Sequence, residues 1–173
     1  MYHITLITGG ARSGKSSFAL KLAEEKYTAR AFIATANATD NEMEIRISNH
    51  KKERGNKYLT YEEHINIVDT LKSLPGNMEV AVIDCITVWM GNLFYKFNNS
   101  VNRIQEFINE FIKYISCPSC NLIFVTNEVG YGIIPENSTA RSFRDIAGST
   151  NSLIAQKADS VYICFCGIPH QLK

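Results

Sequence analysis

Eight consecutive residues near the start of the chain have the types and spacing that bind a nucleoside triphosphate. They are Gly9, Gly10, Ala11, Arg12, Ser13, Gly14, Lys15 and Ser16. Their order fits G-x-x-x-x-G-K-[ST], the P-loop pattern. Glycines let backbone N–H groups turn inward around an anion, and the start of a helix adds partial positive charge there. We expect Lys15 to neutralise the β- and γ-phosphates and the Ser16 hydroxyl to bind Mg²⁺.

The residues on either side of this loop support the assignment. Ile4–Thr8 is an apolar run that predicts a short buried strand, and residues 17–25 predict a helix. Strand, glycine loop and helix in that order are the context that the motif requires. The sequence therefore predicts a site for GTP or ATP as substrate near the amino-terminal end.

A histidine lies among cations on a helix predicted over residues 41–53. Glu42, Arg46, His50 and Arg54 are spaced at i, i+4, so they share one face. Such a face is compatible with a solvated surface. It is also compatible with catalysis, because an imidazole among cations is more often neutral and a neutral imidazole can act as a nucleophile. The arginines would hold a phosphate beside it.

A carboxylate follows a second apolar run. Val80–Asp84 has four apolar residues and then Asp84, the Walker-B pattern in which a carboxylate helps to hold Mg²⁺. Asn127 and Glu128 follow another such run. Ligands of open α/β sheets collect at the carboxyl ends of strands. We therefore predict that Asp84 joins Ser16 in a magnesium site.

The elements that must position these residues alternate between strands and helices. Continuous apolar runs suit strands buried on both faces of a parallel sheet. The runs are Ile4–Thr8, Ala31–Thr35, Val80–Asp84, Leu122–Thr126 and Val161–Phe165. The alternation predicts an α/β fold of the P-loop NTPase type, a mainly parallel sheet flanked by helices. No linker or repeat divides the chain, so we expect one nucleotide-binding domain over residues 1–173.

Further helices are expected between these strands. Their ranges are 62–74, 101–115 and 138–158, and residues 167–173 suit a final edge segment. Arg141 and Arg144 fall in the early turns of the last helix, where they could bind a phosphate or form surface ion pairs. His64 is expected at the surface. Trp89 and Met90 are expected in the core or at a subunit interface.

The composition excludes several classes of protein. The 173 residues are 45% hydrophobic and 20% charged, as in ordinary globular proteins. With 18 basic and 17 acidic residues, the net charge of +1 gives no electrostatic case for binding nucleic acid or an anionic membrane. No stretch approaches the roughly 20 apolar residues of a membrane span. An odd number of cysteines, five, and the absence of a signal peptide favour a cytoplasmic location.

Taken together, these motifs resemble the bifunctional adenosylcobinamide kinase / adenosylcobinamide-phosphate guanylyltransferase family of cobalamin biosynthesis. The resemblance spans essentially the whole chain. The matching stretches are Thr8–Ser16, Ile33–Ala36, Asp40–Met43 with Arg46, Ile47, His50 and Lys51, Asp84–Thr87, Val125–Gly130, Gly132 and Ile133, Pro135–Asn137, and Arg144–Gly148 with Asn151.

The resemblance implies two reactions. A nucleoside triphosphate phosphorylates the aminopropanol hydroxyl of adenosylcobinamide. GTP then transfers GMP to the phosphorylated product, giving adenosylcobinamide-GDP and pyrophosphate. The family's second reaction passes through a guanylylated histidine, and His50 occupies that position. The resemblance also implies Mg²⁺ dependence and a homotrimer with sites between subunits.

The chain departs from the family pattern at two positions. Asn49 stands where relatives can carry a second histidine, and Asp84 stands where they can carry the longer glutamate. That carboxylate can contact guanine rather than the metal, and the sequence leaves both roles open for Asp84.

The resulting hypothesis gives each group a role. The P-loop amides and Lys15 bind the triphosphate, His50 attacks the α-phosphorus, and Arg46 and Arg54 stabilise the transition state. One alternative is a monofunctional P-loop kinase of another small metabolite, which would form no covalent nucleotide. Another is a GTP-dependent switch, but the chain lacks the Asn-Lys-x-Asp segment expected of one.

Overall fold

Seven strands form one sheet at the centre of the molecule. The computed structural model describes residues 2–38 and 41–173, without the side chains of Glu42, Arg46 and Glu53. The strands are β1 (Ile4–Gly9), β2 (Arg30–Ala34), β3 (Leu59–Glu62), β4 (Val80–Asp84), β5 (Asn121–Val125), β6 (Ser160–Phe165) and β7 (Ile168–Gln171). Their order is β3-β2-β4-β5-β1-β6-β7. Every neighbouring pair is parallel except β6 and β7, which are antiparallel.

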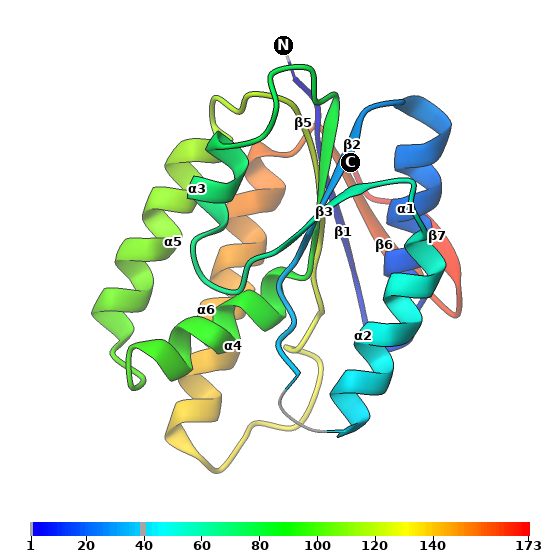
Figure 1. The fold of residues 1–173 in the computed structure, drawn as a ribbon. Coiled ribbons are helices and arrows are strands. Elements are labelled where there is room, and N and C mark those ends of the chain that lie inside the picture. The colour runs from blue at the N-terminus through cyan, green and yellow to red at the C-terminus, as the bar shows by residue number, and fades with distance from the viewer. Residues whose placement is uncertain (1, 39–40) are drawn as a thin grey trace.

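Helices cover both faces of this sheet. They are α1 (Lys15–Lys26), α2 (Asn41–Arg54), α3 (Ile67–Lys72), α4 (Ile86–Lys96), α5 (Val101–Ile115) and α6 (Ser138–Lys157). Figure 1 shows α3, α4, α5 and α6 on one face, with α1 and α2 on the other. The predicted fold class, a mainly parallel sheet flanked by helices, is confirmed. None of the described helices is both long and apolar enough to span a membrane.

One predicted helix begins later than expected. The sequence predicts a helix over residues 62–74, but Glu62 ends β3 and the helix starts at Ile67. The strand extends because residues 59–62 pair in parallel with β2, and the Glu63 carboxylate then accepts two backbone N–H groups of the following turn, at 2.8 Å each. His64, expected at the surface, is half-buried, with its Nδ1 3.1 Å from the carbonyl oxygen of Thr35.

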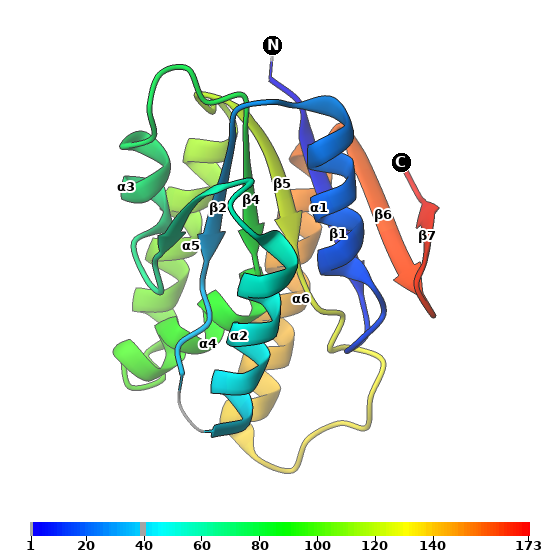
Figure 2. The same cartoon turned by 45° about the vertical axis from the view of Figure 1, so that its right-hand side comes forward.

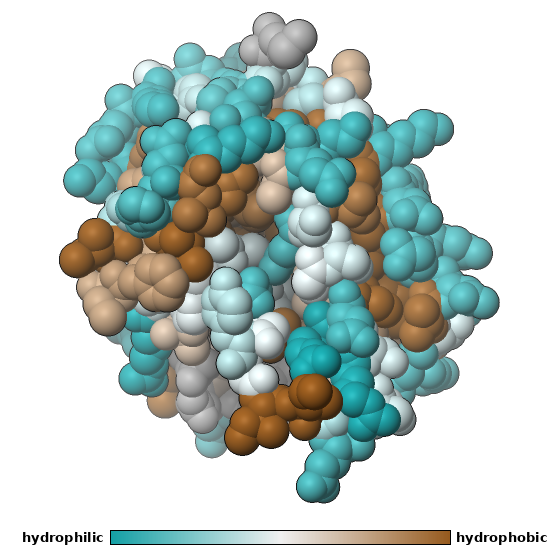
Figure 3. Space-filling view, turned by 180° about the vertical axis from the view of Figure 1, so that it is seen from behind, coloured by the Kyte–Doolittle hydropathy of each residue, from teal (hydrophilic) through white to brown (hydrophobic). Residues whose placement is uncertain are grey.

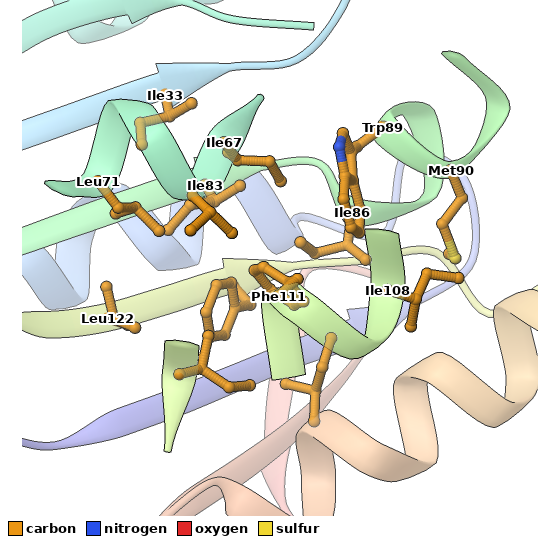
Figure 4. Packing of buried hydrophobic residues seen from close by; sticks show 14 of the residues in the cluster. Ile33, Ile67, Leu71, Ile83, Ile86, Trp89, Met90, Ile108, Phe111 and Leu122 are labelled. Carbon is orange, nitrogen blue, oxygen red and sulfur yellow. The ribbon is translucent and has the colours of Figure 1, made fainter. Parts of the chain in front are cut away.

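The larger core lies between the sheet and helices α3 to α6. It contains three buried aromatic rings in succession, with the centroids of Trp89 and Phe111 5.1 Å apart and those of Phe111 and Phe124 5.4 Å apart. Figure 4 shows Trp89 and Phe111 among the other residues of this cluster. The Trp89 indole N–H donates to the carbonyl of Ile65 at 2.8 Å. Met90 is fully buried in the same cluster. Trp89 and Met90 therefore belong to the core of the chain itself.

Replacing the central ring should be costly. Phe111 is 0% exposed and contacts an aromatic ring on either side, so Phe111→Ala should lower the free energy of unfolding by about 3–5 kcal/mol. Tyr95→Ala is the control, because Tyr95 is 89% exposed and its loss should change stability by less than about 0.5 kcal/mol. Urea unfolding measures both, and similar losses in the two variants would contradict this view of the core.

Candidate active site

The P-loop connects the end of β1 to the start of α1 at the carboxyl edge of the sheet. Gly14 is the residue before the helix and has a left-handed backbone, with φ of +90°. As a glycine it has no side chain that could cap the first turn of α1. The N–H groups at the start of a helix favour binding of an anion, as does the helix dipole.

The turn between β6 and β7 packs directly against this loop. The N–H of Gly167 donates to the carbonyl of Ser13 at 3.0 Å. A Cβ atom on Gly14 would lie 2.9 Å from the Gly167 Cα, and one on Gly9 would lie 2.5 Å from the Cys164 carbonyl oxygen. Gly9 and Gly14 thus permit an approach that any side chain would block.

Lys15 is held beneath the loop. Its side chain is buried, and Nζ donates to the carbonyl of Gly10 at 2.6 Å and to Ser13 Oγ at 3.4 Å. Burial lowers the pKa of Lys15, and the negative charge of Asp84 opposes that shift. A buried ammonium group with few counter-charges favours binding of an anion such as a phosphate.

Asp84 lies at the end of β4, which is separated from β1 by β5. Burial raises the pKa of its carboxyl group, whereas the nearby Ser16 hydroxyl, His50, Lys15 and Arg54 oppose that shift. The structure therefore brings together the P-loop, the end of β4 and the second half of α2.

Arg54 reaches this group from the last turn of α2. Its side chain is only 5% exposed, and its guanidinium carbon lies 4.0 Å from the centroid of the Phe32 ring. Burial lowers the pKa of Arg54, and the charge of Asp84 opposes that shift. Among the described residues, its Nε has no hydrogen-bond partner. His50, one turn earlier, is exposed.

Other predicted site residues lie apart from this group or outside the description. Gly10, Ala11 and Arg12 are exposed on the outside of the P-loop. The side chain of Arg46 lies outside the described residues. On α6, the Arg141 guanidinium donates to the carbonyls of Pro135 and Glu136. Arg144 forms an ion pair with the neighbouring Asp145, whose side chain is exposed. Neither of these two arginines binds a group of the candidate site.

The oxygens of Ser16 and Asp84 suit Mg²⁺ bound together with a nucleotide better than a metal that is bound by protein ligands alone. Mg²⁺ in nucleotide sites is held by one or two protein oxygens together with substrate phosphates. Ser16 and Asp84 supply such oxygens side by side. In the described part of the chain, no three His, Cys, Asp or Glu side chains cluster as a metal site.

A closed ring of hydrogen bonds ties the end of β5 to α4 and α6. The N–H of Asn127 donates to Thr87 Oγ1 at 2.7 Å, and the hydroxyls of Thr87 and Thr126 are 3.0 Å apart. Thr126 donates to Asn151 Oδ1 at 2.8 Å, and Asn151 Nδ2 donates back to the carbonyl of Asn127 at 3.3 Å. Analysis of spacing alone did not find this ring, although all four residues lie in stretches that carry the family resemblance.

The segment that follows this ring forms a long loop below the carboxyl edge of the sheet (Figure 2). It exposes Tyr131, Ile133 and Ile134, and Ile133 is 95% exposed. The view from behind in Figure 3 shows an exposed apolar group at the lower edge of the molecule, where this loop runs. The loop thus places apolar surface next to a highly polar site.

The fold and the site together define a P-loop nucleotide-binding enzyme. A family model described as "Cobinamide kinase / cobinamide phosphate guanyltransferase" matches residues 5–172, and the chain belongs to that family. The predicted family resemblance is therefore confirmed, and with it the assignment to the kinase and guanylyltransferase class of transferases.

Curated relatives agree along their whole length. The "Bifunctional adenosylcobalamin biosynthesis protein CobU" of Escherichia coli is 34% identical over 179 residues, covering 97% of this chain and 98% of the relative. The corresponding CobP protein of Pseudomonas aeruginosa is 34% identical over 168 residues, covering 97% and 96%. Solved structures with a similar fold include the RadB recombinase, with a TM-score of 0.45, 10% identity and coverage of 93% of this chain and 73% of that one.

The contact between the P-loop and the β6–β7 turn can be tested with two glycines. Gly14 and Gly55 both have positive φ, but a Cβ meets a close neighbour only at Gly14. Both alanine variants should lose about 1–2 kcal/mol of stability through backbone strain. Gly14→Ala should lose about 1–3 kcal/mol more through the clash and should also bind nucleotide more weakly. Denaturant unfolding and nucleotide titration measure these effects, and equal losses would rule out the proposed close packing.

Proposed function

We propose that this protein phosphorylates adenosylcobinamide with a nucleoside triphosphate and then transfers GMP from GTP to the product through a guanylylated His50. The observation that carries the proposal is the convergence at one edge of the sheet. Lys15 and Arg54 are buried cations beside Asp84, and His50 and the Ser16 hydroxyl lie close enough to influence the same carboxylate. A surface histidine unrelated to the site would not be expected to lie so close to Asp84.

Different residues bind the triphosphate and attack its α-phosphorus. The backbone N–H groups of Gly9 to Ser16 and the ammonium of Lys15 bind the triphosphate. The His50 imidazole attacks the α-phosphorus, the bond to the pyrophosphate oxygen breaks, and the phosphate acceptor then takes GMP from the imidazole nitrogen. Arg54, together with Arg46, stabilises the additional negative charge of the transition state.

Mg²⁺ is part of this proposal, with Ser16 and Asp84 as the residues that would hold it. The ion would neutralise charge on the phosphates. The closeness of Ser16 to Asp84 supports the metal role over contact with guanine, because one ion could be held by both oxygens. Homotrimer formation, a cytoplasmic location and the use of ATP as well as GTP also belong to the proposal, and they rest on the family resemblance.

The exposure of His50 favours one second candidate, a monofunctional kinase in which this histidine has no chemical role. The two candidates differ in whether a covalent nucleotide forms.

Incubation with GTP labelled on the α-phosphate and Mg²⁺, without corrinoid, should leave acid-labile, alkali-stable label on the protein. His50→Ala should abolish this label and the transfer of GMP, and it should retain phosphorylation of the hydroxyl. His170→Ala is the control, since His170 is an exposed histidine on β7. Absence of label on folded, GTP-binding wild-type protein would favour the monofunctional kinase.

Replacement of the P-loop lysine should affect both reactions. Lys15→Ala should lower kcat for each by about 10²–10³-fold, because a charge that stabilises the transition state is lost. Lys21→Ala is the matched control on the same helix, where Lys21 is exposed and pairs with Glu25 at 3.8 Å. Steady-state kinetics measure both variants, and unchanged turnover in Lys15→Ala would contradict the assigned role.

A further inference from the structure

Glu128 lies at the start of a long loop, and backbone hydrogen bonds hold it in place. It follows β5, the strand between β1 and β4. Its N–H donates at 3.0 Å to the carbonyl of Gly9, the first glycine of the P-loop. Both backbone groups of the preceding residue, Asn127, are held by the hydrogen-bond ring with Thr87 and Asn151. The contacts that shape the nucleotide loop therefore also fix the position of Glu128.

The carboxylate of Glu128 keeps one oxygen available. The side chain is half-buried, and Oε1 accepts the N–H of Gly130 at 2.7 Å. The hydrogen bonds and ion pairs within the described residues leave its other oxygen without a protein partner. Among the described residues, the Glu62 carboxylate is paired with a lysine and the Glu63 carboxylate accepts two backbone N–H groups.

The two reactions of the family differ in whether they need a carboxylate as general base. In the first, the acceptor is a hydroxyl, which must lose its proton as the oxygen attacks phosphorus. In the second, the acceptor is a phosphate monoester, which is already an anion near neutral pH. A general base is therefore needed for phosphorylation and not for transfer of GMP.

The geometry points to Glu128 as the general base of the phosphorylation step, an assignment that rests on the proposed function. The acceptor oxygen forms a bond to the γ-phosphorus. The bond between that phosphorus and the β,γ-bridging oxygen breaks, and its electron pair leaves on the nucleoside diphosphate. The hydroxyl proton moves to the available oxygen of Glu128. Because the side chain is half-buried, the proton then passes to solvent and the carboxylate is restored.

The variant Glu128→Gln separates this role from a structural one. The amide oxygen of glutamine can still accept the Gly130 N–H, so the turn is kept, but the amide cannot take up the proton. Phosphorylation of adenosylcobinamide should fall by about 10²–10⁴-fold in kcat. Transfer of GMP from GTP to adenosylcobinamide phosphate should proceed at the wild-type rate. Glu136→Gln, an exposed position on the same loop, should leave both rates unchanged.

Each contrary result has a distinct meaning. Undiminished phosphorylation by Glu128→Gln would overturn the assignment. Equal loss of both reactions would also overturn it, because it would indicate a role in binding the nucleotide or its metal. A wild-type protein that transfers GMP but never phosphorylates the hydroxyl would contradict the proposed function itself, so the two failures are distinguishable.

Discussion

Burial of opposite charges at the carboxyl edge of the sheet is the constraint on which the rest of the site depends. Lys15 and Arg54 are buried cations, and each has its pKa lowered by loss of solvent. Asp84 is the shared anion, and its pKa is raised by the same cause. Buried charges are costly unless they are well paired. A bound polyanionic nucleotide would supply the missing negative charge. Binding would therefore relieve part of the free-energy cost of burying these cations.

The order of the strands places two carboxylates near the P-loop. Because β5 lies between β1 and β4, the P-loop has Asp84 beyond it on one strand and Glu128 beside it on another. The ring through Thr87, Thr126 and Asn151 joins these strand ends to the helices behind them. Polar groups fixed on rigid elements can hold catalytic geometry more accurately than groups on free loops.

Local patterns in the sequence were sufficient for the fold class and for five of the seven strands. The five apolar runs became strands, and His50 and Arg54 both lie on α2 within the predicted helical region, while their roles in the site stay predictions. Burial of Arg54 against Phe32 could not be predicted, because it depends on how α2 packs on β2. The late start of α3 could not be predicted either, because it depends on tertiary contacts. Residues up to Glu62 pair with β2 and belong to a strand. The hydrogen-bond ring joins residues distant in sequence, and spacing carries no information on such contacts.

The packing of Gly167 against Gly14 has a consequence for folding. The P-loop and the β6–β7 turn are far apart in the sequence, yet the final shape of the loop depends on their contact. The strand that carries the loop also pairs with β6. Contacts between such distant residues cost loop-closure entropy before they contribute stability, so the phosphate loop should reach its final shape late in folding. Nucleotide would therefore bind the folded chain and stabilise it against local opening.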